Sequence, residues 1–285
     1  MISFTMCSTR IGQRLTGVSK TPSIIKKNLM RDNFYTNKII FYDFMLNDNY
    51  SKYDNKNFNT TFQNAKYIYN MNRYALENNR VNINIGGDHS ISLGSVAASK
   101  EKYGDDLIVL WVDAHADINN YEKSISKNTH GMPVYYLLHN NDCLENSDWL
   151  DDNKLTTDQI IYFGLRDVDD YEKSILEDMN ITHCGVLDEK YYPRHFNKLK
   201  NIIKNKKVHL SIDVDALDPK YMPSTGSIAK QGLSMEYLLD LIDNIRDRVV
   251  NVDVVELNLD IGSREDKILS LKNTLSIIDE ITRIG

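Results

Sequence analysis

The chain has 285 residues, 41% of them hydrophobic, which is enough to bury one large core, so residues 1–285 are expected to form a single domain. Its formal net charge is −6, and acidic and basic residues are interspersed along the chain. This pattern leaves no basic face that could follow a phosphate backbone, which argues against nucleic acid as a partner.

The cysteine content and the apolar runs bear on location. Cys7, Cys143 and Cys184 are too few and too scattered for a disulfide framework or a thiolate metal site, which favours a reducing compartment. No apolar run approaches the roughly 18 residues of a membrane span, and the N-terminus lacks the apolar core of a secretory signal. Residues 1–31 contain basic residues, serines and threonines but no acidic residue, a composition that resembles a mitochondrial presequence. Residues 2–6, however, also have the pattern of a β-strand. We expect a cytoplasmic protein, with a mitochondrial location as the alternative.

Apolar runs and helical patterns alternate along the chain. Strands are predicted over residues 2–7, 38–44, 81–85, 107–112, 159–165, 182–187, 208–214 and 252–257. Helices are predicted from Thr21 and Pro22 onward, over residues 62–77, 91–103, 130–139, 171–179, 195–204 and 235–246, and from a cap at Ser263 to Ile284. Residues 47–59 and 118–129 are polar and are expected to be loops. The alternation indicates an α/β fold, with a mainly parallel sheet covered by helices on both faces and ligands beyond the carboxyl ends of the strands.

The strand predicted over residues 107–112 ends in a group of polar residues. Its apolar run leads directly into Asp113, His115 and Asp117. Residues two apart on an extended chain point the same way, so these side chains should converge at one side of the strand's end. Two carboxylates around an imidazole form a cradle suited to a metal ion.

Two other predicted strands end in similar groups. Asp213 and Asp215 follow an apolar run, and a glycine turn after residues 81–85 lets the backbone tuck in and leaves His89 at the rim, with Asp88 assigned to the turn itself. A single Asp-x-Asp pair is more often a capped turn or a solvated surface pair. Three such groups at strand ends instead predict a metal site of four Asp and two His.

The ligand types indicate which ions such a site would hold. Asp and His without Cys favour Mn²⁺, with Zn²⁺, Fe²⁺ and Co²⁺ as alternatives. Four carboxylates packed together would repel one another and raise one another's pKa unless positive charge intervened. Two divalent ions balance four carboxylates, so a pair of ions is expected. A water molecule between ions roughly 3.5–4 Å apart would lose a proton near neutral pH and become a nucleophile.

The same segments resemble the signatures of the ureohydrolase family, most closely its arginase branch. The segments are Gly-Gly-Asp-His-Ser at 86–90, Asp-Ala-His-Ala-Asp at 113–117 and Ser-Ile-Asp-Val-Asp-Ala-Leu-Asp-Pro at 211–219, and the likeness extends from Gly17 to Glu256. The resemblance implies a three-layer α/β/α fold with an eight-stranded, mainly parallel sheet. It also implies hydrolysis of a guanidino group to urea and an amine, and a homo-oligomer, trimeric or hexameric.

The resemblance further implies how the metal ligands are shared. Asp113 and Asp213 would bridge two manganese ions. His89 and Asp117 would complete the shell of one ion, and His115 and Asp215 that of the other. Because a guanidinium carbon is a poor electrophile, stabilised by delocalisation and positive charge, neutral water would not attack it and an activated water is required.

The resemblance assigns catalytic roles to His130, Glu256 and Asp117. A carboxylate at the position of Glu256 can form a bidentate pair with a planar guanidinium, although a Glu at a strand end is otherwise usually a solvated rim charge. His130 matches a family histidine that moves protons between solvent and the site, for which a near-neutral pKa is suited. Its alternative role is that of a helix-capping residue without chemistry. The remaining histidines, His139, His183, His195 and His209, are interpreted as structural or surface groups.

The amino-acid end of an arginine substrate would be bound by loop residues. The family pattern matches Asn119, Ser126 and Asn128 to contacts with the α-carboxylate, and Asp169 and Glu172 to contacts with the α-amino group. Ser227 keeps a hydroxyl where the family usually has Thr. Each of these could also be only a polar loop residue.

The chain departs from the family pattern in three places. Lys127 replaces a Gly, a residue suited to a backbone angle that Lys tolerates poorly, and it adds a cation near the mouth of the site. Residues 226–232 replace the usual Gly-Thr-Pro and double-Gly run, and Thr21 replaces a Gly before Pro22. The chemistry is expected to be intact.

Three hypotheses follow. The first is a manganese hydrolase of L-arginine. The second is another ureohydrolase acting on agmatine, guanidinobutyrate or formiminoglutamate. The third is a noncatalytic metal-binding homologue, suggested by Lys127 and the altered Ser227 segment.

Overall fold

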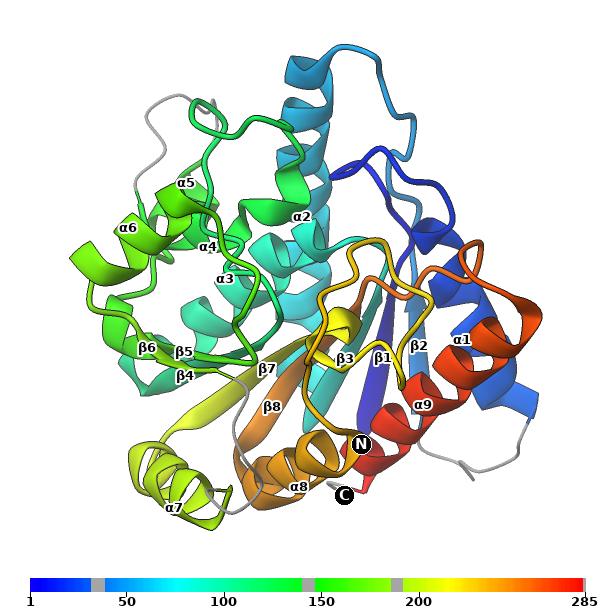
Figure 1. The fold of residues 1–285 in the computed structure, drawn as a ribbon. Helices are drawn as coiled ribbons and strands as arrows, with labels where there is room; N and C mark the ends of the chain where they lie inside the picture. The colour runs from blue at the N-terminus through cyan, green and yellow to red at the C-terminus, as the bar shows by residue number, and fades with distance from the viewer. Residues whose placement is uncertain (32–38, 140–146, 186–191, 284–285) are drawn as a thin grey trace.

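Eight strands form one sheet in which every neighbouring pair is parallel (Figure 1). The structure is a computed structural model that describes residues 1–31, 39–139, 147–185 and 192–283. The strand order is β2-β1-β3-β8-β7-β4-β5-β6. The strands are β1 (Ile2–Cys7), β2 (Ile39–Asp43), β3 (Val81–Gly86), β4 (Leu107–Val112), β5 (Ile160–Phe163), β6 (Thr182–Cys184), β7 (Lys207–Asp213) and β8 (Val249–Val255).

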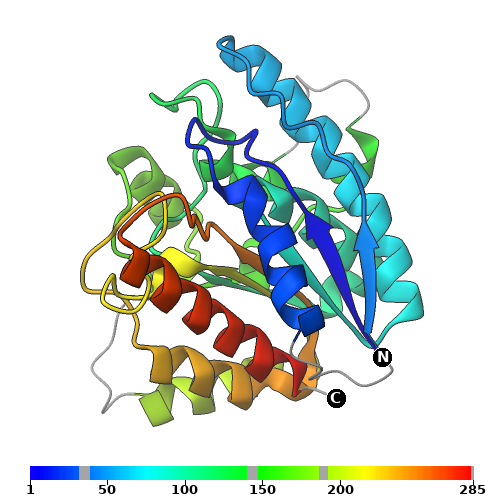
Figure 2. The same ribbon diagram turned by 90° about the vertical axis from the view of Figure 1, so that its right-hand side faces the viewer.

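Helices cover both faces of the sheet (Figures 1 and 2). They are α1 (Thr21–Arg31), α2 (Asp54–Asn78), α3 (Ser92–Tyr103), α4 (Pro133–Leu138), α5 (Asp148–Asp151), α6 (Asp170–Asp178), α7 (Tyr192–Ile203), α8 (Met235–Ile245) and α9 (Arg264–Thr282). One apolar core contains side chains of α1, α7, α8 and α9, and a second contains side chains of α2 to α6. The three-layer α/β/α prediction is therefore confirmed. None of the described helices is long and apolar enough to cross a membrane.

The central strand β4 shows why its sequence is continuously apolar. All six of its residues are buried. Leu107, Val109 and Trp111 lie in the core with α2 and α3, whereas Ile108, Leu110 and Val112 lie in the core with α8 and α9. A strand covered on both faces has no solvent side, so its sequence cannot alternate between polar and apolar residues.

The neighbouring strands carry a buried polar layer on the α3 face. Asp253 of β8 lies at its centre, and its carboxylate accepts hydrogen bonds from Asn84 at 2.7 Å, Ser95 at 2.7 Å and the His209 imidazole at 3.0 Å. Buried polar groups cost free energy unless they are paired, and these are paired. His209 is thus a structural group, as predicted.

The observed elements differ from the predicted ones mainly at their ends. Helix α2 begins at Asp54, eight residues before the prediction, because polar Asn57 and Thr61 are buried and hydrogen-bonded to Ser51 and Thr129 instead of facing solvent. Strand β8 begins at Val249 rather than residue 252, and β5 ends at Phe163. The short helix α5 was not predicted. The predictions for Lys38, Cys143, residues 186–187 and Ile284 fall outside the described residues.

The Gly86–Gly87 turn after β3 allows the chain to pass close to the segment after β1. A Cβ atom on Gly87 would lie 1.7 Å from the carbonyl oxygen of Thr9 and 2.8 Å from its carbonyl carbon, and both are backbone atoms that cannot rotate away. The Gly87 amide also donates to Cys7 O at 3.0 Å. The turn that places His89 therefore requires glycine.

We expect Gly87→Ala to lower the free energy of unfolding by about 1–3 kcal/mol or more, because the backbone must shift to admit the methyl group. Urea denaturation measures this. Gly185→Ala is the matched control, since its Cβ would meet only Leu165 O, at 3.6 Å, and should change stability by less than about 0.5 kcal/mol. Equal stability of the two variants would contradict the close approach.

Candidate metal centre

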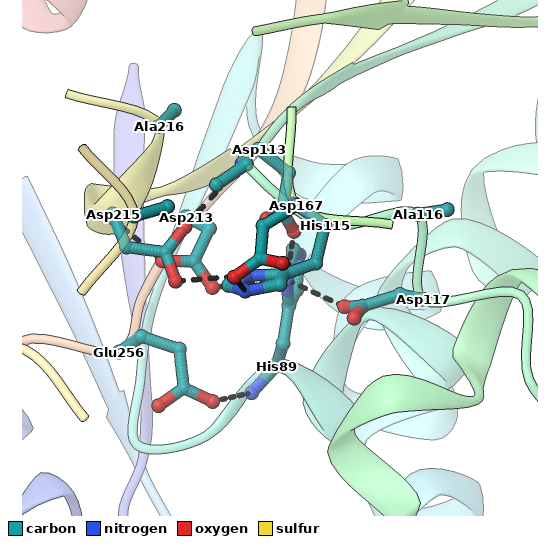
Figure 3. Close-up of polar contacts among 12 residues, drawn as sticks. His89, Asp113, His115, Ala116, Asp117, Asp167, Asp213, Asp215, Ala216 and Glu256 are labelled. Carbon is teal, nitrogen blue, oxygen red and sulfur yellow. Dashed lines mark hydrogen bonds and ion pairs between the residues drawn. The ribbon is translucent and has the colours of Figure 1, made fainter. Parts of the chain in front are cut away.

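Four adjacent strands, β3, β8, β7 and β4, deliver the polar residues to one edge of the sheet. His89 follows the turn after β3, and Glu256 follows β8. Asp213 ends β7, Asp215 lies in the short 3-10 helix η7 (Val214–Ala216), and Asp113 follows β4. Figure 3 shows the side chains of His89, Asp213 and Asp215 close together, with Glu256 beside them and its carboxylate facing the His89 amide. The predicted convergence is therefore present, and the sheet order is its cause.

Five of the six predicted ligands form two groups that share Asp113, and the sixth, Asp213, lies beside them. In the first group, His89 Nδ1 lies 3.0 Å from Asp113 Oδ2 and 3.0 Å from Asp117 Oδ2. In the second, His115 Nδ1 lies 3.4 Å from Asp113 Oδ1 and 3.2 Å from Asp215 Oδ2. Because the two oxygens of Asp113 face different imidazoles, this carboxylate joins the two groups.

Asp213 contributes through one oxygen. Its Oδ2 lies 3.4 Å from His89 Nδ1, and its Oδ1 accepts a hydrogen bond from the Asp215 amide at 2.8 Å. Asp113 Oδ1 accepts similarly from the His115 amide at 2.7 Å. In both Asp-x-Asp and Asp-x-His segments the first carboxylate therefore fixes the turn that carries the next ligand.

The surroundings of His89 fit a metal ligand. Its Nε2 lies 2.9 Å from Ser211 Oγ, and its ring stacks on Trp111 with centroids 4.3 Å apart. Its Nδ1 is buried and makes no hydrogen bond, although three carboxylate oxygens lie within 3.4 Å. A fixed imidazole nitrogen without a hydrogen-bond partner, facing several carboxylates, is the arrangement that a divalent cation would satisfy.

The electrostatics of the cluster lead to the same conclusion. Burial and then the neighbouring carboxylates Asp215 and Asp113 raise the pKa of Asp213 well above its usual value. Burial raises the pKa of Asp215 to about 6, against the opposing effect of His115. Burial lowers the pKa of His89, but the surrounding carboxylates raise it further, so the net shift is upward. The cluster therefore attracts positive charge, which either protons or metal ions can supply.

Glu256 lies at the wall of the site and is held on both oxygens. Its Oε1 accepts from the His89 amide at 2.9 Å and lies 2.9 Å from His130 Nδ1, and its Oε2 accepts from Gln13 Nε2 at 2.6 Å. Burial would raise the pKa of Glu256, but His130 and the other donors lower it below its usual value. Burial lowers the pKa of His130, and Glu256 raises it, to about 9 overall. The two side chains form an ion pair.

A cavity of about 170 Å³ opens above the cluster. All the predicted site residues line it except His89 and Asp113, which lie beneath. The lining contains His115, Asp117, Asn119, Ser126, Asn128, His130, Asp169, Glu172, Asp213, Asp215, Ser227 and Glu256. Ser124 and Gly131 also line it, and neither was predicted. Gln13 was missed as well, because only the fold brings it to Glu256.

Two of the rim carboxylates also have a structural role. Asp169 and Glu172 form a capping box at the start of α6, in which Asp169 accepts from the Glu172 amide at 2.8 Å and Glu172 accepts from the Asp169 amide at 3.2 Å. Asn119 Nδ2 donates to Asp169 Oδ2 at 2.7 Å. Burial, then Asp117 and Asp169, raise the pKa of Glu172 to about 7. Helix capping therefore accounts for part of this rim.

The departures from the family pattern have local explanations. Lys127 has a φ of 56°, so the position does have the left-handed backbone angle that favours Gly. Its Nζ donates to the carbonyls of Tyr121 and Glu122, at 2.5 and 3.1 Å, so it is tied to its own loop and is not among the cavity-lining residues. Gln231 is also left-handed, with a φ of 61°. The Thr21 hydroxyl donates to Leu257 O at 2.5 Å and ties α1 to the segment after β8.

The other histidines lie outside the cavity. His139 stacks on Tyr135, with ring centroids 4.2 Å apart, and His195 Nδ1 lies 3.4 Å from Cys184 Sγ. His183 is an exposed residue of β6. His209 lies in the buried polar layer. These positions agree with the structural or surface roles that were expected.

Comparison with known proteins identifies the group to which the chain is related. The arginase family model matches residues 2–276. The arginase of Saccharomyces cerevisiae is 36% identical over 228 residues, which are 74% of this chain and 66% of that protein. The crystal structure of Entamoeba histolytica arginase in complex with L-ornithine superposes with a TM-score of 0.86 at 25% identity, over 99% of this chain and 98% of that one. Formimidoylglutamase from Bacillus subtilis shares the fold, with a TM-score of 0.79 at 17% identity over 99% of this chain and 86% of that one. The family match over nearly the whole chain shows that this protein belongs to the arginase family.

Proposed function

We propose that the chain is a binuclear manganese hydrolase that converts L-arginine to L-ornithine and urea. The observation that carries the proposal is the pair of Asp/His groups joined by Asp113 at the base of a polar cavity whose wall holds Glu256. Relatives named arginase, and an arginase crystallised with L-ornithine, support the substrate.

The two groups would each hold one divalent cation. His89 and Asp117 belong to one site and His115 and Asp215 to the other, with Asp113 and Asp213 between them. Mn²⁺ suits this oxygen- and nitrogen-rich set, and Co²⁺, Fe²⁺ and Zn²⁺ are the alternatives. Bound there, the ions would supply Lewis-acid activation of a water molecule and orient it for attack.

Glu256 would bind the guanidinium. Each carboxylate oxygen has two lone pairs. Oε1 uses both, for the His89 amide and His130, whereas Oε2 uses one, for Gln13, so Oε2 can accept a guanidinium N–H directly and a bidentate pair would form once His130 leaves Oε1. The buried carboxylate would keep the planar group at a fixed orientation above the metal cluster. Asp117, at the same edge, would accept a hydrogen bond from the attacking water.

His130 would move the proton. With Glu256 ionised, His130 Nδ1–H donates to Glu256 Oε1. Because the pKa of His130 is about 9, its imidazole is in the positively charged form at neutral pH. A guanidinium paired to Glu256 would partly neutralise that carboxylate and so lower the pKa of His130. His130 is therefore suited to give a proton to the leaving amine and to recover one from solvent.

The rim would select the amino-acid end of the substrate. Asn119, Ser126 and Asn128 provide amide and hydroxyl groups for an α-carboxylate, and Asp169 and Glu172 provide carboxylates for an α-amino group. Ser227 adds a hydroxyl from the facing segment. Agmatine lacks the carboxylate, so these contacts would favour arginine.

A second candidate is a related ureohydrolase that acts on agmatine, guanidinobutyrate or formiminoglutamate. The observation that favours it is the capping box of Asp169 and Glu172, because these carboxylates already serve α6. A noncatalytic metal-binding homologue is the third candidate. We further propose that residues 1–285 act as one domain in a cytoplasmic homo-oligomer, trimeric or hexameric.

We expect the manganese-loaded protein to release urea from L-arginine with a kcat/KM roughly 10- to 100-fold above that for agmatine. This is the difference expected when the hydrogen bonds to one charged group, the α-carboxylate, are lost. Mass spectrometry of products from arginine, agmatine, guanidinobutyrate and formiminoglutamate ranks the substrates directly. Preference for agmatine would select the second candidate. Turnover of none of them by fully loaded protein would select the third.

We expect saturation with Mn²⁺, at about 100 times the dissociation constant, to stabilise the protein by about 2.7 kcal/mol per ion, and Asp113→Asn to abolish this increment, because Asp113 belongs to both groups. Calorimetric titration and thermal melting with and without the metal measure it. Asp170→Asn, in the exposed first turn of α6, is the control and should keep both ions. Unchanged metal uptake by Asp113→Asn would exclude the assigned ligand set.

We expect His130→Ala to lower kcat roughly 100-fold while both ions still bind, because a proton carrier is lost and no ligand is. Steady-state kinetics with parallel metal analysis separate the two effects. His139→Ala removes an imidazole outside the cavity and should leave kcat unchanged. Equal loss of metal and of turnover in His130→Ala would show that His130 supports the metal centre instead.

A further inference from the structure

Arg166, in the segment after β5, has no role in the proposed reaction, yet its five N–H donors lie within hydrogen-bond distance of six backbone carbonyl oxygens. Three acceptors follow β7, two lie in the segment that contains Ser227, and one lies in the segment of Arg166 itself. They are the carbonyls of Asp215, Ala216 and Leu217, of Ala229 and Lys230, and of Gly164. One side chain thus joins three segments at the edge of the cavity.

The contacts after β7 fix the peptide of Asp215. Arg166 Nη2 lies 2.7 Å from Asp215 O, and Nη1 lies 3.1 Å from Ala216 O. Asp215 and Ala216 are the last two residues of the short 3-10 helix η7, so their carbonyl oxygens accept no hydrogen bond from within the helix. The Asp215 amide is held from the other side by Asp213 Oδ1 at 2.8 Å. Both ends of the residue are therefore tied, which aims its carboxylate at His115.

The contacts to the Ser227 segment involve the same guanidinium. Nη2 lies 2.9 Å from Ala229 O and Nε lies 3.0 Å from Lys230 O. The next residue, Gln231, has the left-handed φ of 61°, so the segment is held in a turn that the sequence alone disfavours. Ser227 lines the cavity a few residues earlier. This hydroxyl therefore lies in a segment that Arg166 holds two residues further along the chain.

The backbone of Arg166 adds a link to the loop after β4. The amides of Arg166 and Asp167 both donate to Ala114 O, each at 3.0 Å. Ala114 lies between Asp113 and His115, and its amide lies 3.4 Å from Asp215 Oδ1. Arg166 therefore connects the segments that carry His115, Asp215 and Ser227.

We infer that Arg166 is a positioning residue that sets the geometry of the His115/Asp215 half of the metal centre and, with the same guanidinium, the place of Ser227. The inference rests on the proposed function, because it concerns the same site. Its physical basis is the planar fork of five N–H donors, which reaches acceptors in several directions at once. Lysine has the same charge but its donors share one nitrogen, so Arg166→Lys separates geometry from charge.

The test is a Mn²⁺ titration of metal-free protein by calorimetry, with electron paramagnetic resonance to detect paired ions. Wild type should bind two ions. Arg166→Lys should bind one ion, in the His89 group, with the wild-type constant, and the other roughly 10- to 100-fold more weakly, the loss typical of a residue that orients a ligand. Arg166→Gln, which keeps a planar amide, is measured in parallel so that the result does not depend on one variant folding.

Gln159→Leu is the matched control. Gln159 lies at the opposite end of β5, where its Nε2 donates to the carbonyls of Gly104 and Leu107, both at 2.9 Å. Its replacement removes two side-chain contacts to carbonyls, comparable in kind to those of Arg166, without touching the cavity, so the melting temperature should fall while both ions bind as in wild type. A general loss of stability is thereby distinguished from a loss of positioning.

The outcomes separate the two proposals. Two ions bound by both Arg166 variants with wild-type constants would overturn the role of Arg166 and leave the proposed function standing. A wild-type protein that binds no pair of ions would overturn the proposed function itself. Equal weakening of both ions in Arg166→Lys and Gln159→Leu would show that Arg166 contributes only to overall stability.

Discussion

Four carboxylates and two imidazoles are packed at one edge of the sheet, and the negative charge of the carboxylates attracts protons or cations. The rest of the site is arranged around this cluster. Burial removes the solvent that would screen the carboxylates, so each raises the pKa of its neighbours. Protons on the imidazoles compensate part of this negative charge. The buried Nδ1 of His89 lies close to three carboxylate oxygens but makes no hydrogen bond, an arrangement that suits a metal ion between these atoms better than a proton.

The ligands stay together despite their repulsion because the backbone holds them. Asp113 and Asp213 each accept a hydrogen bond from the amide two residues later, which fixes the turns at the ends of β4 and β7. Trp111 and Ser211 fix the ring of His89 from behind, and Arg166 holds the carbonyl of Asp215. A cation can then bind without paying to order its ligands, which is how a preorganised site gains affinity.

The wall and rim of the cavity depend on contacts between segments that are distant in the chain. Glu256 is oriented by Gln13, which lies 243 residues away, and by His130. Asp169 and Glu172 cap a helix and line the cavity at the same time, so helix formation constrains side chains that the proposed substrate would contact. Lys127 and Gln231 both have the left-handed backbone angle that Gly favours, although neither residue is Gly.

The amino-acid sequence by itself determined the parallel α/β class, the eight strands and the convergence of six Asp and His side chains at one edge of the sheet, because continuous apolar runs mark buried strands and two-residue spacing places side chains on one side of a strand's end. It also located the Ser263 cap of α9, since capping depends on neighbours within a single turn. The order of the strands was decided only by tertiary packing, and with it the contacts of Glu256 with Gln13, of His89 with Ser211 and of Arg166 with six carbonyls. The early start of α2 at Asp54 has the same origin, because its polar residues are buried by segments far away in the chain. Local spacing encodes which way a side chain points, whereas the partner it meets depends on how distant segments pack, and no local pattern specifies that.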